Sequence, residues 1–244
     1  MQLSFDLGLN SILPKVRARL LAAFGPQQAD GRLDPVAQMV KTLISARTPD
    51  PLSWAAFVRL TRRWPDWARM AEAPVGEIER ALHGVTFPDQ KARQLLSALK
   101  LLAVRTGGFH LGLLAELSVE QAMHWLHGLP GVGWTTAAAV LNLSTLKRPA
   151  LVVDANLHRI ARRIGLVGRG ADAAETYQML MDQAPQGWDA EALFELHWLF
   201  KRLGQQVCLT VEPKCRLCPL NDLCARIDVD LPQTGEVVQF AVRA

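Results

Sequence analysis

Residues 129–133 read Leu-Pro-Gly-Val-Gly and lie between two segments whose apolar residues recur at helical spacing. The glycines of such a hairpin can adopt positive φ and let the backbone approach a ligand closely. We expect Leu129 and Val132 to anchor the hairpin in the core, while amides near Gly131 and Gly133 bind a phosphate at the start of the next helix. The alternative is an ordinary glycine-rich turn, because a short Gly-x-Gly motif is weak evidence alone.

A second stretch, residues 152–163, reads Val-Val-Asp-Ala-Asn-Leu-His-Arg-Ile-Ala-Arg-Arg. It places the carboxylate of Asp154 at the start of a helix and basic residues on the turns that follow. Considered alone, an aspartate at this position is more often a helix N-cap than a catalytic group. Its interpretation therefore depends on the other motifs of the chain.

The rest of the chain is also predicted to be helical. Apolar residues recur at helical spacing almost everywhere, and no segment alternates as a strand over a useful length. Ser118 with Gln121, and Asp172 with Glu175, have the spacing of capping boxes. About ten helices joined by short loops predict an all-α fold. Four glycines are expected to end helices: Gly84, Gly128, Gly165 and Gly204.

Composition sets the limits of the interpretation. With 244 residues, half of them hydrophobic, the chain can bury one large core or two modest ones, so we expect one or two domains. A net charge of +4 and a pI near 9.1 permit a polyanionic partner without requiring one. Neither a long apolar run nor a targeting segment is evident, so we expect a cytoplasmic protein without a membrane partner.

All four cysteines lie in one short segment near the C-terminus, whereas a secreted disulfide framework would spread pairs along the chain. Their spacing, C-x6-C-x2-C-x5-C, allows four thiolates to close around one [4Fe–4S] cluster. Structural zinc also accepts four thiolates, but zinc sites tend to combine two short C-x2-C pairs, and only one is present. The predicted cluster ligands are Cys208, Cys215, Cys218 and Cys224.

Taken in order, the hairpin, the Val-Asp-x4-Arg stretch and the four cysteines resemble the endonuclease III branch of the helix-hairpin-helix glycosylase superfamily, over about residues 30–226. The resemblance implies two helical lobes with a DNA-binding cleft between them. Residues 31–144 would form a six-helix lobe with the hairpin. Residues 1–30 and 145–226 would form the iron–sulfur lobe, and residues 227–244 a C-terminal tail. The implied partner is double-stranded DNA with a damaged or mismatched base, bound by a monomer.

The same resemblance assigns roles to Asp154 and Thr135. The family's essential aspartate falls on Asp154, which would stabilise the positive charge that grows on the sugar as the base leaves. Bifunctional members carry a lysine where this chain has Thr135, and a hydroxyl cannot form a Schiff base. Adenine-mismatch members carry a glutamate at a site that corresponds here to Lys41, which argues against adenine removal. Thymine-mismatch members share the Val-Asp-Ala-Asn stretch seen at residues 153–156.

Two loops of the family fill the gap left by an extruded base. They correspond here to Arg47, which is otherwise an exposed arginine, and to Phe87, which is otherwise a core phenylalanine. Further candidate phosphate contacts are Lys214, Arg216 and Arg226. Trp134 could line a base pocket or pack in the core, and for His158 a surface or core position is favoured over a proton shuttle.

These observations predict a monofunctional DNA glycosylase of base excision repair, with water as the nucleophile. One alternative is weak lyase activity through another amine, for which Lys41 is the candidate if burial lowers its pKa. A second alternative is a non-catalytic protein that binds lesions. The retained Asp154 argues against it, because phosphate binding does not need that carboxylate.

Overall fold

The computed structural model describes residues 11–28 and 31–229. Regular structure in these ranges consists of eleven α-helices and two short 3₁₀-helices, with one isolated β-bridge between Leu33 and Ser144. The predicted all-α fold is confirmed. None of the described helices has the length and apolar character needed to cross a bilayer. Most of the predicted tail, residues 230–244, lies outside the described residues, as do residues 1–10.

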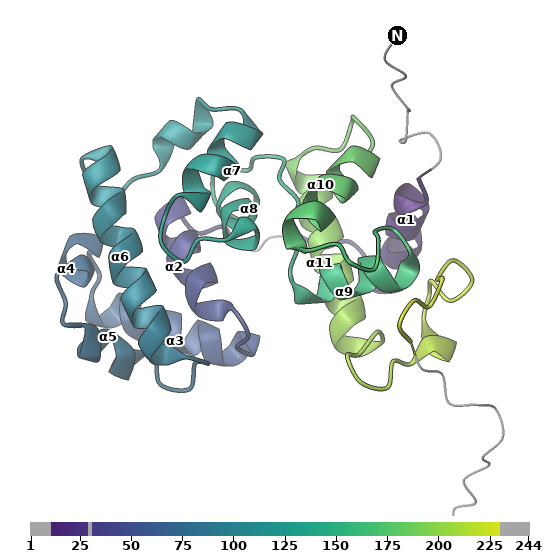
Figure 1. The fold of residues 1–244 in the computed structure, drawn as a ribbon, viewed down its shortest axis with the longest axis horizontal. Coiled ribbons are helices and arrows are strands. Elements are labelled where there is room, and N and C mark those ends of the chain that lie inside the picture. Colours follow the sequence, from purple (N-terminus) through teal and green to yellow (C-terminus); the bar gives the residue numbers. More distant parts are fainter. Residues whose placement is uncertain (1–10, 29–30, 230–244) are drawn as a thin grey trace, which may run out of the picture.

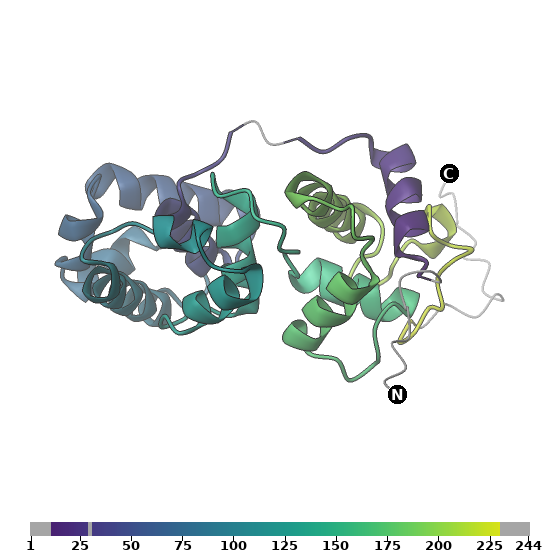
Figure 2. The same cartoon turned by 90° about the horizontal axis from the view of Figure 1, so that it is seen from above.

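The helices form two groups that separate in both views (Figures 1 and 2). The first group holds six helices of seven or more residues together with the five-residue α4. It comprises α2 (Pro35–Ser45), α3 (Asp50–Arg63), α4 (Trp67–Ala71), α5 (Val75–Ala81), α6 (Pro88–Thr106), α7 (Val119–His127) and α8 (Trp134–Leu143). The second comprises α1 (Leu13–Phe24), α9 (Ala155–Ile164), α10 (Ala173–Gln183) and α11 (Ala190–Gln206). The two lobes agree with the expected architecture, and their exact boundaries stay a prediction.

The apolar helix α8 links the lobes. Its residues 136–142 are all buried, so it has no solvated face over this length. It packs against α2 and α7 in its own lobe and against α10 and α11 in the other. A helix that is apolar all round must be covered on every side, which explains why α8 lies at the junction.

Local sequence signals set most of the helix ends. Both predicted capping boxes are present, at Ser118 in α7 and at Asp172 in α10. Gly165 ends α9 in a left-handed conformation, as predicted. The prediction for Gly204 was wrong, because this residue lies inside α11. A Cβ there would stand 2.6 Å from Oδ1 of Asn156, so the glycine permits α9 and α11 to pack closely instead of ending a helix.

Candidate active site

The hairpin before α8 presents free backbone donors. Gly131 has φ +75° and Gly133 is the N-cap of α8, and both glycines are exposed. Their N–H groups donate no hydrogen bond to any described residue. Leu129 and Val132 are buried, 2% and 3% exposed, and fix the hairpin to the core. Exposed amides at a helix N-terminus provide the geometry that an anion needs, and the phosphate contact itself stays a prediction.

Asp154 and Thr135 lie close to each other across the junction between the lobes. The Thr135 hydroxyl, on the first turn of α8, donates to the carbonyl oxygen of Val153 at 2.7 Å. Asp154 follows as the half-buried N-cap of α9, and its Oδ1 accepts a hydrogen bond from the amide of Leu157 at 2.8 Å. Its Oδ2 has only a 3.4 Å contact with the Asn156 side-chain amide. The N-cap alternative is therefore confirmed for one carboxylate oxygen, and the catalytic role of Asp154 stays a prediction.

A buried histidine supports the segment before Asp154. His197, on α11, donates from Nδ1 to the carbonyl oxygen of Val152 at 2.9 Å. Burial lowers the pKa of His197, and the opposing effect of the Asp154 charge on this pKa is smaller. The imidazole is accordingly neutral at pH 7, and its Nε2 is an acceptor. The sequence analysis did not identify this residue.

Two further side chains on the same face of α11 connect the lobes. Lys201 Nζ donates to Oδ1 of Asp50 at 2.9 Å, and Gln205 Nε2 donates to Oδ2 of the same carboxylate at 3.0 Å. Burial raises the pKa of Asp50, but the hydrogen bonds and the Lys201 charge outweigh it and keep this pKa below its ordinary value. The four-residue spacing of His197, Lys201 and Gln205 was the available sequence signal, because it places all three on one helix face.

A cavity of about 600 Å³ opens between α2 and α3 of one lobe and α11 of the other. Lys41 lines it, and no described residue accepts a hydrogen bond from its Nζ. Burial lowers the pKa of Lys41, the positive charge of Lys201 lowers it further, and Asp50 raises it. Lys41 is thus a half-buried amine in the interlobe cavity and not an exposed surface lysine. The full lining is Gln27, Gln28, Gly31, Arg32, Leu33, Gln38, Lys41, Trp54, Leu143, Phe194 and Trp198.

The two predicted gap-filling residues are both exposed and both have left-handed backbones. Arg47 has φ 56°, and Phe87 has φ 54° and a side chain in which 51% of the surface is exposed. Left-handed conformations are unfavourable for such residues, so they persist only where surrounding contacts impose them. The alternative of a core phenylalanine is excluded, and the role in filling a gap in DNA stays a prediction.

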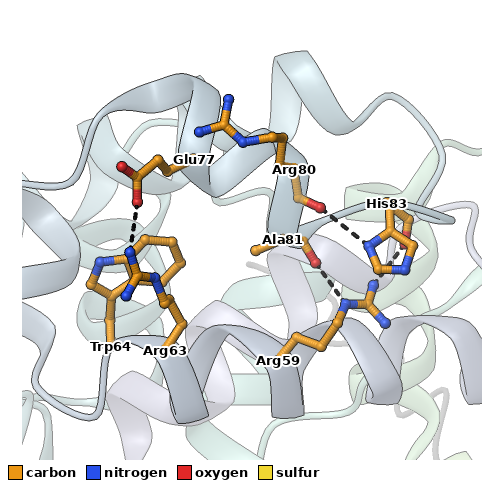
Figure 3. Close-up of a pocket in the computed structure, with 7 residues that line it drawn as sticks. All are labelled: Arg59, Arg63, Trp64, Glu77, Arg80, Ala81 and His83. Atoms are coloured by element: carbon orange, nitrogen blue, oxygen red, sulfur yellow. Dashed lines mark hydrogen bonds and ion pairs between the residues drawn. The ribbon is translucent and has the colours of Figure 1, made fainter.

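Two arginines on α3 help to fix the chain that leads to Phe87. They line a pocket of about 450 Å³ formed by Arg59, Arg63, Trp64, Glu77, Arg80, Ala81 and His83 (Figure 3). Arg59 donates to the carbonyl oxygens of Ala81 and His83 at 3.0 and 2.7 Å. Arg63 pairs with Glu77 at 3.3 Å. Arg63 fastens α3 to the start of α5, and Arg59 fastens it to the end of α5 and the chain that follows. The pocket contains none of the predicted site residues.

The four cysteines surround one small cavity, together with Arg163 and Arg226. All four are partly buried, and burial raises the pKa of the Cys218 and Cys224 thiols. Within the described ranges, no group of three or more His, Cys, Asp or Glu side chains is arranged to hold a metal ion. The donor set nevertheless fits a thiolate cluster. N–H groups reach two of the sulfurs, from Arg163 to Cys208 and from the Arg226 amide to Cys224, both at 3.4 Å.

Helix α9 is tied directly to the cysteine loop. Arg163 also donates to the carbonyl oxygens of Leu209 and Thr210 at 2.6 and 3.0 Å. Arg159 donates to the carbonyl oxygens of Gly204 and Cys208 at 3.2 and 2.8 Å. The helix that has Asp154 as its N-cap therefore also holds the first cysteine in place.

The remaining candidates have separate positions. Lys214 and Arg216 are exposed beside the cysteines, and Arg226 is exposed but donates to the side chain of Asn221 at 2.7 Å. Trp134 packs against His124 and His127 of α7 and Tyr177 of α10, which accords with a packing role. The ring of His158 contacts the carbonyl oxygen of Ala171 at 2.8 Å and has a structural role.

This arrangement of hairpin, aspartate and two lobes agrees with the known proteins that the chain resembles. Residues 40–186 match the HhH-GPD superfamily base excision DNA repair protein, so the chain belongs to this superfamily. Within it, the chain is 29% identical over 191 residues to endonuclease III of Synechocystis sp., covering 78% of this chain and 80% of the relative. It is 27% identical over 190 residues to endonuclease III-like protein 1 of Gallus gallus, covering 76% of this chain and 62% of that longer relative.

Solved structures show the same fold. A trapped endonuclease III–DNA covalent intermediate matches with a TM-score of 0.73 and 23% identity, covering 88% of this chain and 96% of the other. A thermostable thymine-DNA glycosylase matches with a TM-score of 0.69 and 20% identity, covering 90% and 98%. These two structures show the shared fold, and the family match over residues 40–186 together with the endonuclease III relatives confirms the predicted endonuclease III-like DNA glycosylase.

Proposed function

We propose that this chain is a monofunctional DNA glycosylase that hydrolyses the N-glycosidic bond of a damaged or mismatched base extruded from duplex DNA. The bond between C1′ and the base breaks, and its electron pair leaves with the base. The carboxylate of Asp154 stabilises the positive charge on the sugar. A water oxygen then bonds to C1′, and its proton passes to the carboxylate. The exposed amides of Gly131 and Gly133 would hold the phosphate chain during this step.

The contact between Thr135 and Val153 carries the monofunctional part of the proposal. At the position where bifunctional relatives have a lysine, this chain has a hydroxyl that donates to a backbone carbonyl 2.7 Å away. A hydroxyl cannot form an imine with C1′, so the covalent step of strand cleavage has no nucleophile here. Hydrolysis needs only a carboxylate and water, and Oδ2 of Asp154 has no partner closer than the Asn156 amide at 3.4 Å.

A panel of duplexes tests the proposal. Each carries one oxidised, deaminated, alkylated or mismatched base and is assayed with and without alkali, and with borohydride as a trap. Breaks that appear only after alkali are expected, and they should vanish in Asp154→Asn while DNA affinity stays near the wild-type value. Unchanged turnover in Asp154→Asn would refute the catalytic role, and absence of base release from every duplex would favour the lesion-binding alternative.

The position of Lys41 favours a second candidate function, weak lyase activity. Its amine lies in the interlobe cavity with a lowered pKa, and an unprotonated amine is the nucleophile that a Schiff base requires. Borohydride would then trap a covalent adduct with the wild type, and Lys41→Met would abolish it. Trapping that survives this change would exclude Lys41 as the amine.

We further propose that Cys208, Cys215, Cys218 and Cys224 hold a [4Fe–4S] cluster. Four thiols around one cavity, with N–H donors directed at two of them, support this assignment over dispersed free cysteines. When bound, the cluster would supply structural or redox-sensing chemistry and no part of the hydrolytic step. The working form in the proposal is a cytoplasmic monomer on double-stranded DNA.

A further inference from the structure

Lys91 on α6 is an almost fully buried lysine, with 6% of its surface exposed, and it lies away from Asp154 in the other lobe. Its Nζ donates to the carbonyl oxygens of Ile44 and Ala46 at 2.9 and 2.5 Å, and to the hydroxyl of Thr48 at 3.1 Å. These acceptors are at the C-terminus of α2 and in the loop after it, where helix carbonyls lack partners and the helix dipole favours a cation. All three ammonium protons thus have acceptors, one in the last turn of α2 and two in the loop that contains Arg47.

The same acceptors continue to the Phe87 loop. The Thr48 hydroxyl also accepts a hydrogen bond from the amide of Thr86 at 3.1 Å. The Thr86 hydroxyl donates to the carbonyl oxygen of Arg47 at 2.8 Å. Two loops that are far apart in sequence are consequently joined by direct hydrogen bonds, and Lys91 lies beneath them.

This network explains how two unfavourable backbones persist side by side. Arg47 and Phe87 are each held in a left-handed conformation that is unfavourable for a residue with a side chain. Each of them directly adjoins a hydrogen-bonded threonine, Thr48 and Thr86 respectively. Without the network, each loop can relax to an ordinary conformation and the two side chains lose their common position.

We propose that Lys91 is a positioning residue that holds Arg47 and Phe87 together as one two-pronged element, on which extrusion of a base from paired DNA depends. The inference rests on the proposed function and assigns to Lys91 a role in extrusion without contact to DNA or to the carboxylate of Asp154. Preorganisation is the physical reason, because two prongs fixed beforehand need no further ordering when they enter the duplex.

The protonation state of Lys91 is compatible with this role. Burial lowers the pKa of Lys91 to about 8, so most of the amine is protonated at pH 7 and can donate three hydrogen bonds. The carbonyl oxygens of Ile44 and Ala46 replace the water that the ammonium lost on burial.

Two substrates separate positioning from general damage to the protein. Single-turnover release of the base most readily excised in the panel is measured in duplex DNA and in a single strand of the same sequence. Lys91→Met should slow release from the duplex by about tenfold or more, equivalent to about 1.4 kcal/mol, and release from the single strand by less than about twofold. Lys100→Met, which removes an exposed charge from the same helix, should leave both rates unchanged. Equal slowing on both substrates, or no slowing on either, would overturn the proposal.

A second variant avoids emptying a buried site. Thr86→Val removes the hydroxyl that bonds Arg47 and keeps Lys91, so it should show the same preference for the single strand with a smaller effect. Extrusion is also read without catalysis, from the fluorescence of 2-aminopurine placed beside a guanine–thymine mismatch. Wild type should raise this fluorescence and Lys91→Met should not. The signal would fail to distinguish the two proteins if Lys91 had no positioning role, and this reading holds even if the wild type releases no base.

Discussion

Substitution of Gly131 by alanine tests whether the hairpin geometry is required for stability and DNA binding. The geometry of this glycine gives two separate energetic costs for an added Cβ. At φ +75° a Cβ costs about 1–2 kcal/mol in backbone conformation. That Cβ would also stand 3.0 Å from Cβ of Gln94 on α6, closer than ordinary van der Waals contact. We expect Gly131→Ala to lower the free energy of unfolding by at least 1–2 kcal/mol, and hence the melting temperature by roughly 2–8 °C.

The expected effect on DNA follows from the same geometry. If the hairpin relaxes to accept the new Cβ, its exposed amides lose their alignment, and each 1.4 kcal/mol lost in binding is about tenfold in affinity. Thermal unfolding and fluorescence anisotropy with a labelled duplex measure the two quantities. Gly170→Ala, where nothing lies within 4 Å of the added Cβ, is the matched control and should change neither.

A neighbouring glycine makes the test sharper. Gly133 has φ −85°, and a Cβ there meets nothing within 4 Å, so Gly133→Ala should leave the melting temperature unchanged. It should nevertheless weaken DNA binding, because the methyl group occupies the space from which a phosphate approaches the amides. Gly131→Ala with wild-type stability and affinity, or Gly133→Ala with wild-type affinity, would refute the phosphate-binding role of the hairpin.

Three further predictions concern other parts of the chain. Tyr177 is the only tyrosine, and burial, with a smaller effect of Glu120, raises its pKa to about 12. The tyrosine absorbance of the folded protein should therefore titrate well above pH 10, and Glu120→Gln should lower the midpoint of this titration. The stability contributed by the neutral phenol should be lost as the pH rises from 10 towards 12. Asp50 has a lowered pKa, so its contribution to stability is present above about pH 4 and is lost as the pH falls below that value, and Asp50→Asn should flatten the acid limb of a melting-temperature profile. Arg163→Met removes the N–H donor to Cys208, so the anaerobically purified variant should hold less iron and acid-labile sulfide than the wild type. Wild-type protein that contains zinc and no iron would contradict the cluster assignment.

Sequence reasoning succeeded where the signal was local. Helical spacing, the capping boxes at Ser118 and Asp172, and the left-handed glycine at Gly165 all depend on residues within one or two turns. The prediction that Gly204 ends a helix failed because a glycine is needed there to make room for Asn156, a residue on another helix. A glycine needed for close packing and a glycine that ends a helix look the same in sequence.

In the candidate site, too, the residues that belong to short motifs could be predicted and those with distant partners could not. Asp154, Thr135 and the hairpin glycines could be proposed from motifs, since each motif is a short stretch. Lys91 and His197 could not, because their acceptors are the carbonyl oxygens of Ile44 and Val152, which lie more than forty positions away. Backbone carbonyls carry no sequence signature, so a lysine or histidine that serves them is recognised only in three dimensions.

The short helix α9 has Asp154 at its N-cap, and its Arg159 and Arg163 side chains donate hydrogen bonds to the cysteine loop. Because both ends belong to one ten-residue helix with direct hydrogen bonds to the loop, a displacement of the loop would tilt the N-cap as well. Under the proposed catalytic role of Asp154, oxidation at Cys208 would therefore slow base release through a mechanical displacement, without chemical change to the residues around the substrate.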